Sequence, residues 1–455
     1  MSKSFLIIGS GPAGYQSALE LRKAYPEAKI ILIEKYKLGG ACLHRGCIPS
    51  KLLGTIKDEK DFLKLLKKHK TILEKAIEQS LTKAEVEIIK GEADLYLDSE
   101  TFSVKVKSCD DEGYVIKNAE SQYIREFKNI DYLILATGSR PRKINFEKLN
   151  QEKAKEKAIS SDSFFCDLKL ESGLADSYCF IGAGYIGVEL ASMLRRLGKS
   201  VRIIEMADDI LSFLDKDLRE RIRANLNKQG IKIETSVKNI DYEAISEDKI
   251  FVAIGRELVL PNIFSRNLGS TLDASSPHSL GEFSQIFNKG DLLTELDSLK
   301  LKDRVFLVGD LSEEMPLAHY AYAEAKSLIK ALKADDKPCR PNLDHIPLVI
   351  FTDTEFAQCG MSLEKVKREY ADDFFILEKS WAENAKARLI GEERSYIRFI
   401  FATEKKKLVS CSILGKSATD LISIAVPLIH LGLTYAEIAD MVFPHPTLGE
   451  LFVLD

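Results

Sequence analysis

Two cysteines in a glycine-rich segment are the residues of this sequence best suited to chemistry. Cys42 and Cys47 lie in residues 39–51, which read GGACLHRGCIPSK. On an ideal helix their Cα atoms would be roughly 8.6 Å apart, whereas a disulfide requires less than about 7 Å. The segment must therefore depart from a regular helix if the cysteines pair, and Gly46 and Pro49 allow such a departure. A disulfide in such a place can be reducible, which suits a redox catalyst.

A metal site and two unpaired core thiols are the alternatives for these cysteines. A structural metal site needs about four ligands, and the sequence contains no second close pair of cysteines. We therefore predict a redox disulfide and no bound metal. The remaining cysteines are far apart in the sequence and are interpreted as packing residues: Cys109, Cys166, Cys179, Cys339, Cys359 and Cys411.

A histidine near the end of the sequence is a candidate base for thiol chemistry. His445 lies between two prolines in the run FPHPTLGE, and Glu450 follows five residues later. That carboxylate would fix the tautomer of the imidazole and raise its basicity. Such a base suits thiol–disulfide exchange, because the thiolate is the species that attacks. Alone, His445 could equally be a structural cap; together with the cysteine pair, it is predicted to be catalytic.

Two copies of a nucleotide-binding pattern are expected to position these residues. Each copy has a buried strand, a glycine-rich turn, a helix and a second buried strand that ends in an acid. Two complete copies, each with its acid at a spacing of roughly 20 residues, are far more specific than one glycine motif. The first copy contains Gly9, Gly11, Gly14 and Glu34, and the second contains Gly182, Gly184, Gly187 and Glu205.

The second copy predicts which nicotinamide cofactor is bound. Glu205 would accept hydrogen bonds from an unmodified ribose and would repel a 2′-phosphate. No cluster of arginines follows it, since the next four residues read MADD. We therefore predict NAD rather than NADP.

The composition excludes several classes of protein. The chain has 455 residues and a net charge of −4, with Lys and Arg spread along it, so nothing indicates nucleic-acid binding. No apolar run reaches the roughly 18 residues that a membrane helix needs. The apolar run at residues 5–8 leads directly into a glycine turn and is too short for a signal peptide. We therefore expect no membrane segment, a mature protein that starts near Met1, and a cytoplasmic location.

The motifs resemble, along nearly the whole chain, those of the class I pyridine nucleotide-disulfide oxidoreductases. Within that family they are most similar to the dihydrolipoamide dehydrogenase branch, because CLHRGCIPSK and HPTLGE are closer to its versions than to those of glutathione or mercuric reductases. The resemblance implies FAD and NAD as cofactors and a homodimer in which His445, held by Glu450, reaches the partner subunit. It also implies a lipoyl domain of a 2-oxo acid dehydrogenase or glycine cleavage complex as partner.

The resemblance further implies roles for individual residues. Cys42 would be the interchange thiol that reacts with the substrate, and Cys47 the thiol that contacts the flavin. Lys51 would lie near the reactive nitrogen of the flavin, and Glu189 near the nicotinamide. Other expected contacts are with FAD for Thr137, Gly138, Asp310, Ala318 and His319, and with NAD for Tyr185 and Gly255.

The fold expected from the two units and the resemblance is α/β, with two Rossmann-like domains and a C-terminal α+β dimerisation domain. Buried strands at 132–135, 250–252 and 305–308 each run into a turn that would face a ligand. The predicted domains are FAD-binding at 1–145 and again at 259–336, NAD-binding at 146–258, and dimerisation at 337–455.

Four features depart from the family pattern. Residues 240–253 are shorter than usual, so the NAD domain is expected to lack a small β-meander, and the chain stops five residues after Glu450. Tyr185 is typical of glutathione reductases, where such a residue covers the nicotinamide pocket. His44 and Arg45 replace an Asn and a small or acidic residue, and two basic groups beside the cysteines would stabilise thiolates.

Two other functions fit the same motifs. The first is an NADH-dependent reductase of a low-molecular-weight disulfide, which would differ in the direction of electron flow and the preferred substrate. The second is a non-catalytic sensor that binds FAD and NAD, which a shortened NAD domain would suit. The presence of both cysteines, Lys51, His445 and Glu450 favours an enzyme.

Overall fold

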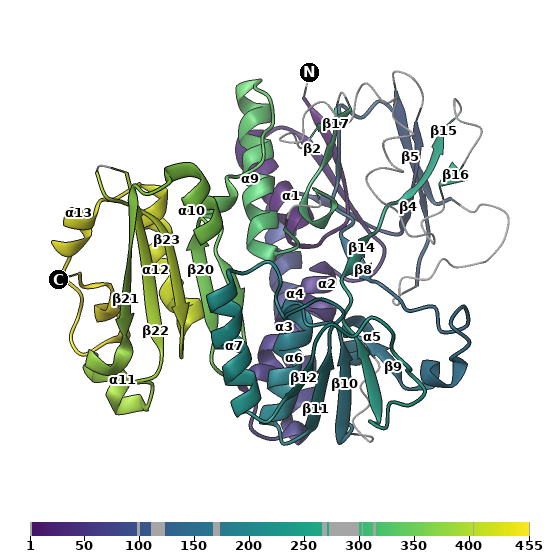
Figure 1. Cartoon of the computed structure of the whole chain (residues 1–455). Coiled ribbons are helices and arrows are strands. Elements are labelled where there is room, and N and C mark those ends of the chain that lie inside the picture. The colour runs from purple at the N-terminus through teal and green to yellow at the C-terminus, as the bar shows by residue number, and fades with distance from the viewer. Residues whose placement is uncertain are drawn as a thin grey trace.

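The computed structural model contains two nucleotide-binding units and a separate C-terminal domain, which lies to the left in Figure 1. The structure describes residues 2–97, 101–110, 123–166, 173–265, 271–272, 300–302, 304–312, 315–403 and 405–454. The expected α/β fold with two Rossmann-like units and an α+β domain is confirmed.

The first unit is built on a six-stranded sheet of order β17-β18-β7-β1-β2-β3. In its centre, β1 (Ser4–Ile8) pairs in parallel with β2 (Lys29–Glu34) and β7 (Tyr132–Leu135). Burial on both faces explains why these strands read as unbroken apolar runs. The other strands are β3 (Glu87–Lys90), β17 (Lys300–Lys302) and β18 (Val305–Leu307).

Different layers cover the two faces of this sheet. Helices α1 (Pro12–Ala24) and α9 (Ala318–Ala334) pack on the face that carries Phe5 and Ile7. A smaller sheet of order β16-β15-β4-β5-β6 packs on the face that carries Leu6. Its strands are β4 (Glu92–Leu97), β5 (Phe102–Lys107), β6 (Arg125–Phe127), β15 (Asn262–Ser265) and β16 (Thr271–Leu272).

The second unit is a five-stranded sheet of order β12-β11-β10-β13-β9, and all of its pairs are parallel. Residues 235–248 contain neither helix nor strand, so the short link expected before β13 is present. The elements are β9 (Ala158–Ser160), β10 (Ser177–Ile181), β11 (Ser200–Ile204), β12 (Lys232–Glu234), β13 (Lys249–Val252), η1 (Glu152–Glu156), α5 (Ser161–Cys166), α6 (Tyr185–Arg196) and α7 (Lys216–Lys228).

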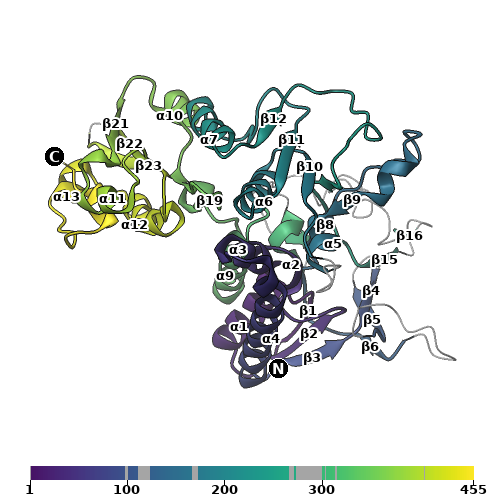
Figure 2. The same ribbon diagram turned by 90° about the horizontal axis from the view of Figure 1, so that it is seen from below.

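Two short antiparallel strands carry the chain between the units. It leaves the first unit through β8 (Ser139–Pro141) and returns through β14 (Arg256–Leu258). Three consecutive helices lie at the junction of the two units, as the view from below in Figure 2 shows. They are α2 (Gly40–Arg45), α3 (Cys47–Thr55) and α4 (Glu59–Lys83), and α4 buries Phe62, Leu66 and Leu81 while its other side is largely exposed.

The C-terminal domain is an antiparallel sheet of order β19-β20-β23-β22-β21 with helices around it. Its core includes the buried ring of Trp381 and the fully buried strand β22. The elements are η3 (Leu343–His345) before the sheet, then β19 (Leu348–Ile350), β20 (Phe356–Gly360), α10 (Leu363–Tyr370), β21 (Phe374–Ser380), η4 (Trp381–Glu383), α11 (Ala385–Ile390), β22 (Tyr396–Ala402), β23 (Lys407–Leu414), α12 (Ala418–His430), α13 (Tyr435–Ala439) and η5 (Leu448–Phe452). The short helix η2 (Gly309–Ser312) belongs to the first unit, where it contacts α9.

Within the part of the chain that the structure describes, no helix combines the length and the apolar character needed to cross a membrane.

Candidate functional site

The first glycine turn has the geometry of a phosphate cradle. Gly9 has φ +99°, and a Cβ atom there would lie 2.4 Å from the carbonyl oxygen of Ala136. A Cβ at Gly14 would lie 1.9 Å from the carbonyl oxygen of Gly9, whereas a Cβ at Gly11 would meet no described atom within 4 Å. The first and third glycines therefore permit close packing, and the second leaves open space in front of helix α1, where a phosphate binds.

The second glycine turn repeats this arrangement. Gly182 has φ +102°, and a Cβ there would lie 2.4 Å from the carbonyl oxygen of Ala253. A Cβ at Gly187 would lie 2.3 Å from the carbonyl oxygen of Gly182, and Gly184 again faces open space among the described atoms. Both turns therefore fit a dinucleotide.

The two acids at the ends of β2 and β11 also behave alike. Glu34 accepts hydrogen bonds from the backbone N–H of Ser10 (2.8 Å) and of Tyr36 (2.7 Å). Glu205 accepts them from the N–H of Ala183 (2.5 Å) and of Ala207 (2.8 Å). Each carboxylate is thus held beside its glycine turn, where it can accept hydrogen bonds from a ribose.

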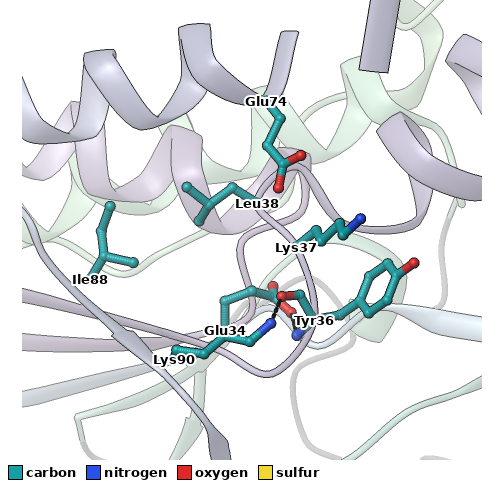
Figure 3. Close-up of a pocket in the computed structure, with 7 residues that line it drawn as sticks. All are labelled: Glu34, Tyr36, Lys37, Leu38, Glu74, Ile88 and Lys90. Carbon is teal, nitrogen blue, oxygen red and sulfur yellow. Dashed lines mark hydrogen bonds between the residues drawn. The ribbon is translucent and has the colours of Figure 1, made fainter. Parts of the chain in front are cut away.

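A pocket of about 240 Å³ opens beside Glu34 at the end of β2, as Figure 3 shows. Glu74 points into it from α4, and Lys90 donates a hydrogen bond to the carbonyl oxygen of Tyr36. The carboxylate of Glu34 suits the ribose of a nucleotide, and the apolar side chains of the pocket suit its flat base. Besides Glu34, the lining residues are Tyr36, Lys37, Leu38, Glu74, Ile88 and Lys90, none of which the glycine motif indicated.

The segment that contains the cysteines is irregular, as their spacing required. Helix α2 ends at Arg45 and α3 begins at Cys47, because Gly46 between them has φ −135° and ψ −112°. Both cysteines are thiols in this structure, and their side chains share a hydrogen bond. The break in the helix therefore brings the two sulfurs together.

The two thiols differ in acidity. The hydrogen bond with Cys47 and burial raise the pKa of Cys42 far above its ordinary value. The hydrogen bond from Cys42, followed by the positive charge of Lys51, lowers the pKa of Cys47 to about 7. Cys47 is also the more exposed of the two residues. Cys47 is therefore the more acidic of the two thiols.

Lys51 and Glu189 form an ion pair that links all three domains. The Nζ of Lys51 lies 2.7 Å from Oε2 of Glu189, whose side chain is 6% exposed. The other oxygen of Glu189 accepts a hydrogen bond of 2.9 Å from the backbone N–H of Phe351, and the ammonium lies 4.3 Å from the centre of that aromatic ring. Phe351 gave no signal in the sequence, because its contact with the site crosses a domain boundary.

The remaining predicted residues on the flavin side fall into two groups. Asp310 accepts a hydrogen bond from the hydroxyl of Ser139, and Thr137, next to Gly138, donates one to the carbonyl oxygen of Val259. Ala318 and His319 begin α9, and Nε2 of His319 donates to the carbonyl oxygen of Pro347 at 2.6 Å.

Tyr185 connects the flavin side to the nicotinamide side. Burial raises the pKa of its phenol, and the charges that act on it are those of Asp310, Arg256, Glu189 and Cys47. The side chain is therefore placed among the residues expected to bind both cofactors. Gly255, with φ +99°, follows β13 at the same edge of the second sheet.

The expectation that His44 and Arg45 both stabilise thiolates is wrong. His44 is buried, and its Nε2 donates to the carbonyl oxygen of Leu38 at 2.8 Å. Burial lowers the pKa of this imidazole to about 4, so it is neutral at physiological pH. Arg45 points to Asp162, 3.4 Å away, and its guanidinium lies 5.0 Å from the ring centre of Tyr36. The charge that most favours the Cys47 thiolate is that of Lys51, not that of His44 or Arg45.

The prediction that all other cysteines are packing residues is partly wrong. Cys109, Cys179, Cys359 and Cys411 are buried, whereas Cys166 and Cys339 are exposed. Cys166 ends the short helix α5, and Cys339 follows α9 in an irregular segment. Residue spacing alone did not distinguish these two surface positions from the core.

His445 and Glu450 are in contact, as their spacing predicted. Nδ1 of His445 donates to Oε1 of Glu450 at 2.8 Å, and Oε2 accepts the backbone N–H of Thr447 at 2.9 Å. The hydrogen bond from His445 lowers the pKa of that carboxyl. The imidazole is 72% exposed. In Figure 1 the C-terminal end lies at the outer edge of the C-terminal domain, whereas α2 and α3 lie near the centre of the molecule.

Comparison with known proteins gives consistent results along the chain. Residues 3–325 match the pyridine nucleotide-disulphide oxidoreductase family, and residues 346–455 match its dimerisation domain. The dihydrolipoyl dehydrogenase of Geobacillus stearothermophilus is 28% identical over 98% of this chain and 94% of the relative. That of Mycoplasma genitalium is 28% identical over 99% of this chain and 97% of the relative.

Solved structures share the same fold. LpdA from Mycobacterium tuberculosis has a TM-score of 0.79 at 18% identity, and the HOCl-induced flavoprotein disulfide reductase RclA from Escherichia coli has 0.77 at 20% identity. Both similarities cover 99% of this chain and 98% of the other. The family's cofactors are FAD and NAD, and the two cradles described above fit them. The chain therefore belongs to the pyridine nucleotide-disulphide oxidoreductase family.

Proposed function

We propose that this protein is an NAD-dependent dihydrolipoamide dehydrogenase that works through a disulfide between Cys42 and Cys47. The observation that carries the proposal is the meeting of the two thiols at the break between α2 and α3, next to the ion pair of Lys51 and Glu189. The names of the relatives, dihydrolipoyl dehydrogenases that align over nearly the whole chain, support the substrate.

The direction of the acidity difference supports a separate role for each sulfur. In thiol–disulfide exchange the sulfur with the lower pKa leaves faster. A thiolate of dihydrolipoamide would attack Sγ of Cys42, form a mixed disulfide with it and release Cys47 as a thiolate. The second substrate sulfur would then displace Cys42, which leaves lipoamide oxidised and the enzyme dithiol reduced by two electrons. FAD, when bound, carries those two electrons on to NAD⁺.

The positive charge of Lys51 would stabilise the thiolate that this exchange releases. Glu189 holds the ammonium in place and is itself fixed by the backbone of Phe351. The ammonium of Lys51 also lies 4.3 Å from the centre of the Phe351 ring. A charge held in this way needs little reorganisation when the thiolate forms.

His445 would be the base that removes the protons of the substrate thiols. Glu450 accepts the Nδ1 hydrogen and leaves Nε2 free to take up a proton. The distance between the C-terminal end and the cysteine helices supports a homodimer in which this base serves the partner subunit. The lipoyl domain of a 2-oxo acid dehydrogenase or glycine cleavage complex is the proposed source of dihydrolipoamide, and the cytoplasm, which keeps thiols reduced, is the proposed compartment.

The domain boundaries predicted from the sequence remain part of the proposal. They assign FAD binding to residues 1–145 and 259–336, NAD binding to 146–258 and dimerisation to 337–455. The crossing strands β8 and β14 lie close to the first two of these boundaries.

An anaerobic titration tests the function directly. The holoenzyme is mixed with about one equivalent of dihydrolipoamide, and NAD⁺ is added afterwards while visible absorbance is recorded. We expect a long-wavelength charge-transfer band from the Cys47 thiolate beside the flavin, which disappears as NADH forms. If NADH produces the band and dihydrolipoamide does not, the substrate is wrong and an NADH-dependent reductase of another disulfide replaces the proposal. If neither reagent reduces the protein, the non-catalytic sensor replaces it.

A further inference from the structure

The carboxylate of Asp162 lies between two arginines from different parts of the chain. Its Oδ2 is 3.4 Å from Nη1 of Arg45, and its Oδ1 is 3.5 Å from Nη1 of Arg256. Arg45 is the last residue of the redox helix α2, and Arg256 is the first residue of the returning strand β14. Asp162 itself follows β9, the edge strand of the NAD-domain sheet. One carboxylate therefore joins the NAD domain to the helix that holds Cys42.

The contacts continue from Arg256 to the predicted flavin site. Its Nε donates to the hydroxyl of Ser139 at 2.7 Å, and its Nη2 donates to the carbonyl oxygen of the same residue at 2.7 Å. The hydroxyl of Ser139 in turn donates to Asp310. A chain of polar contacts thus runs from the redox helix through Asp162 to Asp310, which is expected to contact FAD.

Helix α5 is also fixed by apolar packing on its other side. Phe164 and Phe165 are buried, with the ring of Phe164 5.5 Å from that of Phe251 in the NAD-domain sheet and the ring of Phe165 6.5 Å from that of Phe62 in α4. The two views agree that α2, α5 and β8 meet near the centre of the molecule (Figure 1 and Figure 2). The helix therefore forms the joint between the two nucleotide-binding domains.

The position of Asp162 connects this joint to the nicotinamide. In parallel sheets, ligands bind at the carboxyl ends of the strands. Asp162 follows β9 at the same edge where Gly255 follows β13 and Gly182 follows β10. The side chains of Asp162 and Arg256 are 18% and 16% exposed, so their attraction is screened less than that of a surface pair.

We propose that Arg45 and Asp162 are positioning residues that hold the NAD domain against the redox helix and so set the approach of the nicotinamide to the flavin. Neither residue touches the reacting sulfurs, so the reaction of the dithiol should not depend on them. The inference rests on the proposed function only for the identity of that dithiol. It also gives a role to Arg45, which differs from the residue that the family usually has at this position. Stabilisation of a thiolate did not account for that difference.

The test compares the two half-reactions of the holoenzyme in a stopped-flow spectrometer. In Asp162→Asn we expect reduction of the flavin by NADH to slow about tenfold, because small misplacements of reacting groups cost rates of this order. Reduction by dihydrolipoamide should remain within about twofold of the wild type, because the sulfurs keep their neighbours. Arg45→Gln should show the same selective loss at a smaller size, and Arg45→Lys should recover most of it.

An equilibrium measurement and a matched control accompany the kinetics. Calorimetric titration of the oxidised holoenzyme with NAD⁺ should give a severalfold higher dissociation constant for Asp162→Asn. The control is Glu59→Gln, which removes another ion pair between the two domains: Oε2 of Glu59, the first residue of α4, lies 3.0 Å from Nζ of Lys199. We expect this control to behave like the wild type in both half-reactions.

Three outcomes would overturn the inference. They are equal slowing of both half-reactions in Asp162→Asn, an unchanged NADH half-reaction in both variants, and a control as impaired as Asp162→Asn. Arg45→Gln carries the test if Asp162→Asn does not fold, since the Arg45 side chain is 32% exposed. If dihydrolipoamide does not reduce the wild-type flavin, only the proposed substrate is refuted. Dithiothreitol would then be used as the dithiol, and the comparison of the NADH half-reactions would remain valid.

Discussion

The cysteine pair and the His445–Glu450 pair are built in opposite ways. The charge next to Cys47 depends on a distant part of the chain, since Lys51 is held by Glu189 from the second unit. His445 is positioned by residues within five places of it in the sequence and is 72% exposed. The thiols and the ion pair next to them therefore lie within one chain, whereas the proposed base is oriented by its own short segment. The difference supports the proposal that His445 serves the cysteines of another copy.

The largest effect is expected from removing the sulfur that carries the negative charge. Cys47→Ser should abolish turnover of dihydrolipoamide, because no disulfide can form, while the yellow colour of bound FAD remains. Activity and visible absorbance are measured on the same purified sample. Cys166→Ser is the matched control, since that cysteine is also exposed but lies on α5. Loss of FAD from Cys47→Ser would mean that the cysteine has a structural role.

Removing the base should have the next largest effect. His445→Ala should lower the rate of dihydrolipoamide oxidation about 10²–10³-fold, the usual contribution of a general base. Glu450→Gln should lower it less, because the imidazole keeps an acceptor for its Nδ1 hydrogen. Steady-state rates across a range of pH measure both variants. Unchanged activity in His445→Ala would remove the assignment of this residue as the base.

A mixed dimer decides whether the base acts across subunits. Chains with Cys47→Ser and chains with His445→Ala, carrying different tags, are expressed together and the heterodimer is purified. If the base comes from the partner, one of the two sites has every required group, and up to half of the wild-type activity should return. If the base acted within its own chain, both sites would lack a group and the heterodimer would be inactive.

The contrast between the two thiols can be tested through the charge next to them. Lys51→Met should raise the pKa of Cys47 from about 7 by about one unit, because it removes a positive charge that favours the thiolate. The thiolate exists above its pKa, so the charge-transfer band of the reduced enzyme should appear only at higher pH. A pH titration of that band measures the shift. Lys64→Met, on the exposed side of α4, is the control. An equal shift of the Cys47 pKa in this control would mean that the charge of Lys51 has no special effect on the thiolate.

Patterns confined to short stretches of sequence predicted most of the fold and half of the site. The glycine turns require positive φ at Gly9 and Gly182, which a sequence reader can infer from residue type. The break at Gly46 followed from helix geometry, and the contact between His445 and Glu450 followed from their spacing. Each of these features is determined by neighbours in the chain.

Features determined by distant neighbours were missed or misinterpreted. Phe351 approaches Lys51 across 300 residues of sequence, and Asp162 approaches Arg45 across more than a hundred. Neither pairing leaves a periodic or local signal. The sequence likewise shows that His44 is basic by type, but only the structure shows that burial keeps it uncharged.

The smallest catalytic effect is therefore expected from His44. His44→Leu removes a buried hydrogen bond to the carbonyl oxygen of Leu38 and should cost about 1–3 kcal/mol in the free energy of unfolding. The pH at which the Cys47 thiolate forms should not move, because the imidazole is neutral above its pKa of about 4. A cationic histidine would give a different result, since its loss would raise the pKa of Cys47 as Lys51→Met does. Urea unfolding and the pH titration of the charge-transfer band, measured on one preparation, separate these cases. A rise in the midpoint pH of that titration would show that His44 is charged in the holoenzyme.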